Sequence, residues 1–183
     1  SSLASFSEYQ RERAWTWEHQ ALVRARGIAG DDALLQAFEV LRDEVLARKR
    51  DADALREDVV AMRRRMRAEL DRSDAALFDL KQGDGGLVDL EFLLQFLLLR
   101  ESGTHPDLRT PRASPTILDA LHVEGLLDAN TRAALQVAHA MLLDAGMRCT
   151  LDRRPRRVAR DERIELAREA IRDAACAQGL HFD

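Results

Sequence analysis

The sequence predicts an all-α protein, a bundle of about seven helices built around one core. Apolar residues recur at spacings of three and four along most of the 183 residues, which is the periodicity of amphipathic helices. Aromatic residues make up 5% of the chain and there are four prolines, so the composition does not favour sheet. A chain of this length buries about 70% of its unfolded surface, and its core needs no disulfide or metal.

The first expected helix begins at Ser7 and runs through Trp15 and Leu22. Gly27 and Gly30 follow its last apolar turn. Glycine adopts the left-handed conformation that commonly ends helices, so we expect the helix to end at this point.

Two amphipathic helices are expected next, and the charged junction ARKRDAD favours a break between them over one continuous helix. Asp31 or Asp32 can cap the first, because carboxylates accept the free N–H groups of a first turn. Asp51 and Asp53 form a D-x-D that can cap the second, which is a better reading than a metal site. The apolar positions are Leu34, Phe38, Leu41 and Val45, and then Leu55, Val59, Met62, Met66 and Leu70.

An almost uniformly apolar segment predicts a buried helix at Leu87–Glu101. Residues 87–99 are too few to cross a bilayer and include carboxylates, so the segment reads as a core helix. Three further helices are expected over residues 116–122, 128–146 and 161–177, the last one after the basic linker RRPRR.

Charge and cysteine content limit the class of protein. The formal charge of −4 argues against a dedicated nucleic-acid binder, which is usually basic. Cys149 and Cys176 have no C-x-x-C spacing, and no signal peptide begins the chain, so we expect a reduced, cytoplasmic protein with no membrane partner. The start at SSLASF, without a strand–turn–helix unit to house a reaction, suggests a piece of a longer protein.

A glycine-rich stretch leads into the buried helix and reads KQGDGGLVDLEF. Gly83, Gly85 and Gly86 allow either a tight turn or the close approach of a ligand to a helix N-terminus, where free N–H groups attract anions. The spacing matches neither G-x-G-x-x-G nor G-x-x-x-x-G-K, so the pattern favours the turn and leaves the ligand site open.

Two carboxylates lie near the start of the same helix. Asp89 and Glu91 are separated by about 200° around the helix and cannot share a face. The helix dipole favours Asp89 in the first turn, whereas Glu91 lies with Leu87 and Gln95 on a narrow polar strip. An unpaired buried carboxylate is unfavourable, so we expect arginines or a lysine from a companion helix to neutralise both, with Arg24, Arg26 and Lys81 as the candidates. That arrangement is either a structural salt bridge or the edge of a cleft for a metal, nucleotide or partner.

A second segment, AWTWEHQALVRARG, contains both tryptophans of the chain together with Glu18, His19, Arg24 and Arg26. It predicts either a core helix anchored by aromatic residues or a source of cations for the acids of the glycine-led helix. His19 alone is typical of a hydrogen-bonded core histidine. The basic runs MRRRMR and RRPRR are expected to be solvated faces, and the histidines and cysteines lack zinc-site spacing.

Together these two segments resemble the bacterial bifunctional glutamine synthetase adenylyltransferase/adenylyl-removing enzymes, in the C-terminal helical part of the adenylyltransferase half. The equivalent helical domain of PII uridylyltransferases is related. The family pattern matches Lys81, Gly85, Gly86, Asp89, Leu90, Glu91 and Phe92. The resemblance implies a parent nucleotidyltransferase that moves AMP from ATP, with Mg²⁺, to glutamine synthetase under control of PII protein and glutamine.

The family's catalytic Gly-Ser pair and strand-borne acids are absent from this sequence. The resemblance therefore implies that the catalytic core lies outside this chain, which is expected to contain no catalytic residue or metal ligand, to need no cofactor of its own and to be inactive alone. We expect one helical domain, with residues 1–103 next to the core and 104–183 as C-terminal helices.

Our main hypothesis is a lid or wall on the nucleotide cleft, with nine residues at the cofactor: Trp17, Glu18, Arg24, Arg26, Lys81, Gly85, Gly86, Asp89 and Glu91. The alternatives are a regulatory module that docks PII protein or glutamine synthetase and senses glutamine, the equivalent domain of a PII uridylyltransferase, or a scaffold alone.

Overall fold

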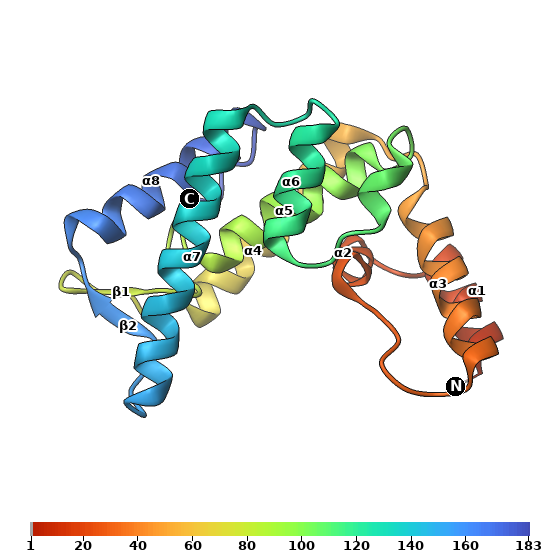
Figure 1. The fold of residues 1–183 in the computed structure, drawn as a ribbon, viewed down its shortest axis with the longest axis horizontal. Helices are drawn as coiled ribbons and strands as arrows, with labels where there is room; N and C mark the ends of the chain where they lie inside the picture. The colour runs from red at the N-terminus through yellow and green to blue at the C-terminus, as the bar shows by residue number, and fades with distance from the viewer. Residues whose placement is uncertain (1) are drawn as a thin grey trace.

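The computed structural model describes residues 2–183, which form eight α-helices, one 3₁₀-helix and two short strands. In Figure 1 they follow an arch, with α1 and α3 at one end, α7, α8 and the strands at the other, and α4 and α5 between them. The elements in chain order are α1 (Leu3–Glu12), α2 (Thr16–Arg24), α3 (Asp32–Leu46), α4 (Ala52–Leu70), β1 (Leu77–Asp79), α5 (Leu87–Glu101), η1 (Pro106–Arg109), α6 (Ser114–Val123), α7 (Ala129–Leu151), β2 (Arg157–Ala159) and α8 (Glu162–Ala177).

The all-α prediction is confirmed, with a small addition. Strands β1 and β2 pair antiparallel, with Phe78 opposite Val158, and the Phe78 side chain is fully buried. The pairing ties the basic linker before α8 to the segment that leads into α5. Strands of three residues are too short to show a period of two, so the sequence pattern could not reveal them.

The expected first helix is wrong, because the segment forms two helices. The N-cap of α1 is Ser2, whose hydroxyl accepts the N–H of Ser5. The chain then turns before α2, where the Glu18 carboxylate accepts the N–H of Trp15 at 2.9 Å. A side chain three residues into a helix that reaches back in this way stabilises a new N-terminus. Glu18 also accepts the hydroxyl of Tyr9, which fixes α1 against α2.

The other predicted helix starts are mostly confirmed. Asp31, Asp51, Asp128 and Asp161 each accept N–H groups from the first turn of the helix that follows. The expected end of α7 at Gly146 is wrong, since that helix continues to Leu151. A glycine inside a helix costs about 1 kcal/mol relative to alanine, which the packing of a long helix can offset.

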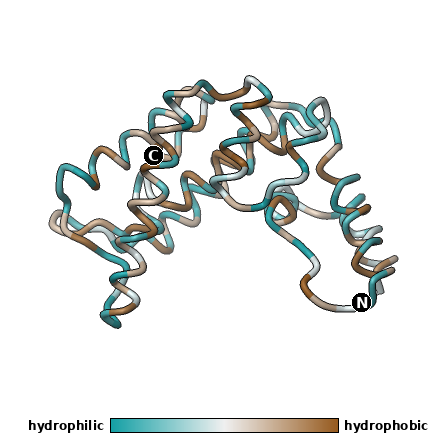
Figure 2. Tube along the Cα trace, viewed as in Figure 1, coloured by the Kyte–Doolittle hydropathy of each residue, from teal (hydrophilic) through white to brown (hydrophobic). Residues whose placement is uncertain are grey.

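Helix α5 forms the centre of the core. Ten of its residues are buried, and it packs against α2, α4, α6, α7 and α8. Figure 2 shows hydrophobic and hydrophilic residues alternating along the outer helices, as expected for elements that cover a core on one side. Among residues 2–183, no helix is both long enough and apolar enough to cross a membrane.

Candidate functional site

Asp89 is paired inside the protein. The residue is buried, and its carboxylate accepts hydrogen bonds from Arg63 Nε at 2.5 Å and from Arg67 at 2.6 Å. The N–H of Gly85 donates a third at 2.7 Å. Burial raises the pKa of the Asp89 carboxyl, and the two arginines act against that rise. Three donors at one carboxylate form the complete pairing that a buried charge requires.

The arginines of this pair come from α4, whereas we expected α2 to supply them. The solvated face predicted for the run MRRRMR is therefore wrong at two positions, because Arg63 is fully buried and the Arg67 side chain is only 15% exposed. Arg64 and Arg65 are exposed as expected. Arg63 follows Val59 by four residues, so the helical period already placed it on the apolar side of α4.

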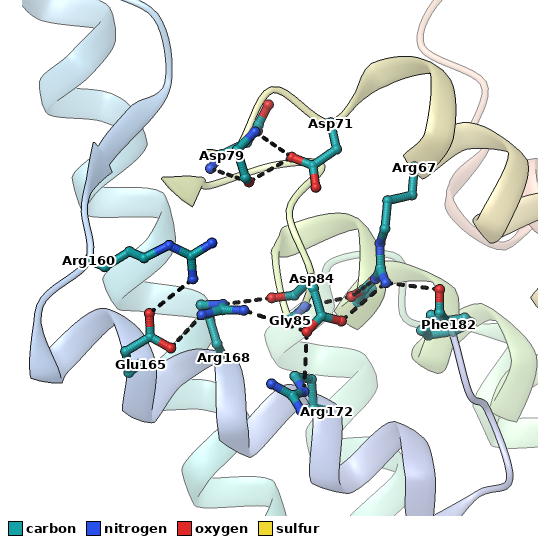
Figure 3. A network of polar contacts seen from close by, with 12 residues as sticks. Arg67, Asp71, Asp79, Asp84, Gly85, Arg160, Glu165, Arg168, Arg172 and Phe182 are labelled. Carbon is teal, nitrogen blue, oxygen red and sulfur yellow. Dashed lines mark hydrogen bonds and ion pairs between the residues drawn. The ribbon is translucent and has the colours of Figure 1, made fainter. Parts of the chain in front are cut away.

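The pair is part of a larger ionic network that Figure 3 shows from close by. Asp84 lies 3.1 Å from Arg67, 3.5 Å from Arg168 and 3.3 Å from Arg172, and the last two belong to α8. Arg67 also donates to the carbonyl oxygen of Phe182 at 2.9 Å. The network therefore holds α8 and the C-terminal tail against α4 and α5.

The glycine turn packs tightly against the rest of the chain. A Cβ at Gly85, whose φ is +76°, would lie 2.6 Å from the carbonyl oxygen of Arg168. A Cβ at Gly86 would lie 2.8 Å from the carbonyl oxygen of Gly83. The first N–H groups of α5 donate to Leu80 and Lys81. Of the two alternatives for this stretch, the contacts favour the structural turn.

Glu91 does have its cation on α2, as expected. Arg24 lies 2.5 Å from Glu91, with side chains that are 43% and 38% exposed. Glu91 is therefore at the surface and not sunk in the core, on the half-buried strip that also contains Leu87 and Gln95. Gln20 of α2 donates to Gln95 at 3.0 Å, so two polar contacts join α2 to α5 along this strip.

His139 of α7 is a residue near this pair that the sequence analysis missed. Its pKa is lowered by burial and, to a smaller extent, by Arg24, while Glu91 acts in the opposite direction. His139 follows the core residue Leu135 by four residues, and this spacing could have indicated that it lies on the buried side of α7. The surface around Arg24 and Glu91 thus involves three helices.

The four remaining predicted site residues, Trp17, Glu18, Arg26 and Lys81, do not come together at one place with Asp89. Trp17 is 48% exposed and lies on the same solvent-facing side of α2 as Arg24. Glu18 instead stabilises the N-terminus of α2 by accepting the N–H of Trp15. Arg26 and Lys81 are exposed, and within residues 2–183 neither makes an ion pair. The structure therefore does not bring Arg26 or Lys81 to Asp89.

Candidates for other chemistry take structural roles. His19 is buried, with Nε2 3.1 Å from the carbonyl oxygen of Gln10, as expected for a core histidine. Asp51 caps α4 and Asp53 pairs with Arg56. In the part of the chain that the structure describes, no three His, Cys, Asp or Glu side chains gather in a way that could hold a metal ion.

Two family models match the chain. The model described as glutamate-ammonia ligase adenylyltransferase matches residues 1–41, and that described as GlnD PII-uridylyltransferase matches residues 54–175, about two thirds of the chain. The second match covers Arg63, Asp89 and Glu91, and the first covers Trp17 and Arg24.

Three similar curated proteins carry the name bifunctional glutamine synthetase adenylyltransferase/adenylyl-removing enzyme. One from Stenotrophomonas maltophilia (strain K279a) is 59% identical over 182 residues, which is 100% of this chain and 20% of that protein. One from Xanthomonas axonopodis pv. citri (strain 306) is 57% identical over 100% of this chain and 19% of its own length. One from Nitrosococcus oceani is 43% identical over 90% of this chain and 17% of its own length.

The chain thus spans about a fifth of the length of the relatives that it matches. With a family model covering most of the helices that build the core, the chain belongs to the GlnD PII-uridylyltransferase family, in the form that occurs in bifunctional glutamine synthetase adenylyltransferase/adenylyl-removing enzymes.

Proposed function

We propose that this chain is the helical domain that completes or covers the nucleotide cleft of a glutamine synthetase adenylyltransferase, an enzyme that regulates nitrogen assimilation. The observation that carries the proposal is the 59% identity to the Stenotrophomonas maltophilia relative over the whole of this chain. Every helix described above therefore has a counterpart in a protein with that name.

The surface that would face the cleft is the outward side of α2 together with Glu91. Arg24 is held by Glu91 but remains 43% exposed, so part of its guanidinium is open to a second anion. Arginine donates from a planar fork and suits phosphate oxygens. Trp17 and Arg26 would extend the same surface, and Lys81 would be a further exposed cation.

The other predicted site residues act through the fold. Glu18 begins α2, while Gly85, Gly86 and Asp89 fix the start of α5. Their contribution to nucleotide binding would be to hold Glu91 and Arg24 at a constant position. In this proposal residues 1–103 lie next to the catalytic core, and residues 104–183 form the C-terminal helices of the same domain.

ATP fits this surface through its phosphates, whereas Mg²⁺ finds no carboxylate cluster among residues 2–183. Under this proposal, Mg²⁺ would be held outside this chain. Its residues would bind and orient the nucleotide and exclude water, and AMP transfer would need a core that supplies acids. Alone, this chain should transfer no AMP.

A chimaera tests the proposal. The 182 aligned residues of the Stenotrophomonas maltophilia relative are replaced by this chain, and AMP transfer from ATP to glutamine synthetase is measured. We expect the chimaera to retain adenylylation and the 183-residue chain alone to show none. A folded chimaera without activity, or turnover by the isolated chain, would contradict the proposal.

A second candidate is a docking module for PII protein or glutamine synthetase, with glutamine as effector. It is favoured by exposed apolar side chains on the neighbouring helices α7 and α8, which are Val137, Leu143, Met147, Leu151 and Leu166. Binding of PII protein to the isolated chain in the absence of ATP would favour docking over the lid. Under both candidates we propose a cytoplasmic location, where Cys149 and Cys176, which form no disulfide with each other, would stay reduced.

A further inference from the structure

Helix α7 is apolar on the side that faces solvent as well as on the side that faces the core. Residues 133–143 contain no aspartate, glutamate, lysine or arginine, although these types make up 33% of the chain. Leu135, Ala138 and Leu142 of this stretch are buried. On the outward side Val137 is 65% exposed, and the other exposed residues are Ala133, Ala134, Ala140 and Leu143. A helix that is apolar all round is normally covered on every side, so we expect a partner on the outward face of α7.

This outward face continues onto α8, and two adjoining cavities lie between the two helices. Their volumes are about 510 Å³ and about 500 Å³. Ala134 of α7 and Ala170 of α8 line both cavities, so the two form one groove. Further alanines line the groove, namely Ala133, Ala138, Ala167, Ala174 and Ala177. Because these side chains are small, the groove can accept large apolar side chains of a partner as knobs enter holes.

Large apolar side chains protrude beside these hollows. Leu166 of α8 is 59% exposed and lines the same cavity as Val137 of α7. One face of the molecule thus presents both the protruding side chains and the hollows that could accept them. Two copies of such a face can interlock, because a two-fold interface uses the same surface patch on both subunits.

The two ends of the groove on α8 carry opposite charges. Arg163 lines one cavity near the start of α8, and Asp173 lines the other toward its end. The ion pairs of α8 use Glu165, Arg168 and Arg172, whereas Arg163 and Asp173 make none within residues 2–183. A two-fold axis halfway between these two residues would place Arg163 of each copy against Asp173 of the other. The same axis would place Leu166 of each copy against Ala170 of the other, so charge and shape agree on one arrangement.

We propose that the groove between α7 and α8 is the interface of a symmetric homodimer of this chain, with the α8 helices of the two copies antiparallel. Leu166 of each copy fills the hollow at Ala170 of the other, and Arg163 pairs with Asp173 at both ends. The dimer does not depend on the proposed function. It would compete with the docking candidate for Val137 and Leu166.

The size of the face sets the expected affinity. Helices α7 and α8 have 23 and 16 residues and extend about 35 Å and about 24 Å, and two helices side by side are about 20 Å wide. Each copy therefore contributes roughly 600 Å², which is the lower limit of specific interfaces. We expect a weak dimer, with a Kd on the order of 10 μM.

Sedimentation equilibrium of the 183-residue chain measures this association directly. Its concentration is varied from about 1 to about 200 μM at constant ionic strength, which spans the expected Kd. The average mass should rise from 20.7 kDa toward twice that value, and the data should fit a monomer–dimer equilibrium. A second measurement on the folded chimaera described above should show the same association.

Leu166→Asp tests the apolar contact. The variant places a carboxylate in the hollow of each partner and should weaken the dimer by a factor of about ten or more. The matched control is Val40→Asp, because Val40 is 62% exposed on α3 and lies outside the groove. The control should dimerise as the parent chain does, and circular dichroism should show the same helix content in both variants, since both positions are exposed.

A charge reversal tests the two-fold arrangement. Arg163→Asp alone and Asp173→Arg alone each bring like charges together at both ends, so each should weaken the dimer about tenfold. The double variant Arg163→Asp/Asp173→Arg restores opposite charges and should recover the Kd of the parent chain. Both new charges also suit the dipole of α8, with the acid near its start and the base near its end, so the fold should persist.

A chain that remains at 20.7 kDa over the whole concentration range would overturn the proposal. Equal association of Leu166→Asp and Val40→Asp would also overturn it, and so would a double reversal that dimerises no better than the single ones. A dimer of the isolated chain that is lost in the folded chimaera would assign the groove to another part of the longer protein and would contradict the proposal as well.

Discussion

Arg63 of α4 and Asp89 of α5 form an ion pair at 2.5 Å in which the two side chains are 0% and 2% exposed. The carboxylate that first suggested a ligand site is therefore held by a buried arginine of the same chain. Because Asp89 also accepts the N–H of Gly85, this pair positions the turn before α5 as well as the helix itself. Because Glu91 lies two residues further along α5, at the helix surface, its position also depends on this contact.

Replacing Asp89 with alanine should destabilise the protein strongly. The change leaves Arg63 charged and buried without a partner, and breaking a buried pair in this way costs about 3–5 kcal/mol. We expect a loss of that size in the free energy of unfolding, measured by urea denaturation. The control is Asp144→Ala, which breaks an exposed pair with Arg148 and should cost less than about 0.5 kcal/mol. Equal losses in the two variants would show that Asp89 contributes no more than a surface charge.

Gly85→Ala tests the close packing of the turn. Gly85 and Gly125 have almost the same φ, +76° and +72°, but a Cβ at Gly125 would have no atom within 4 Å. Gly125→Ala should therefore lower the free energy of unfolding by about 1 kcal/mol, which is the strain of an alanine at a positive φ. Gly85→Ala adds the overlap with Arg168, so its midpoint in urea should be clearly lower than that of the Gly125 variant. Similar midpoints would mean that the turn can move away from α8.

The fold was largely predictable because caps and helical periods act locally. Asp31, Asp51 and Asp128 were identified from their place before an apolar run, and each accepts the expected N–H groups. The break between α1 and α2 was missed because it depends on Glu18, whose carboxylate turns back to Trp15 inside an otherwise continuous pattern. The position of this break thus depends on one side-chain hydrogen bond, which hydrophobic periodicity does not reveal.

The candidate site was predictable in one of its two parts. Glu91 is paired with Arg24. This could be predicted because a carboxylate on an apolar helix needs a cation, which a neighbouring helix can supply. The pairing of Asp89 could not be assigned, because the choice between α2 and α4 depends on how helices distant in sequence pack. Arg63 was overlooked since a run of arginines usually forms a solvated face, although the period of α4 placed this one inside.

Glu91→Gln separates a role at the cleft from a structural one. The pair with Arg24 is exposed, and exposed pairs contribute about 0–1 kcal/mol, so the free energy of unfolding should change little. If Glu91 orients Arg24 toward the nucleotide, the adenylylation rate of the chimaera should fall severalfold. Asp119→Asn is the control, because it weakens another exposed pair, with Arg132, and should leave the rate unchanged. An unchanged rate for the Glu91 variant would remove this residue from the proposed cleft.

His19 should make the protein less stable on mild acidification. Burial is the main cause that lowers the pKa of His19, with Arg50 and Arg48 acting in the same direction. In the unfolded chain a histidine has a pKa of about 6.5, so below that pH the unfolded state binds a proton that the folded state still excludes. The stability from neutral His19 is thus present above about pH 6.5 and is lost as the pH falls toward the lower folded pKa. Urea denaturation at a series of pH values should show this loss, and His19→Gln should reduce it, whereas His181→Gln, a change in the exposed tail, should not. A slope that is the same for His19→Gln and the parent chain would contradict this assignment.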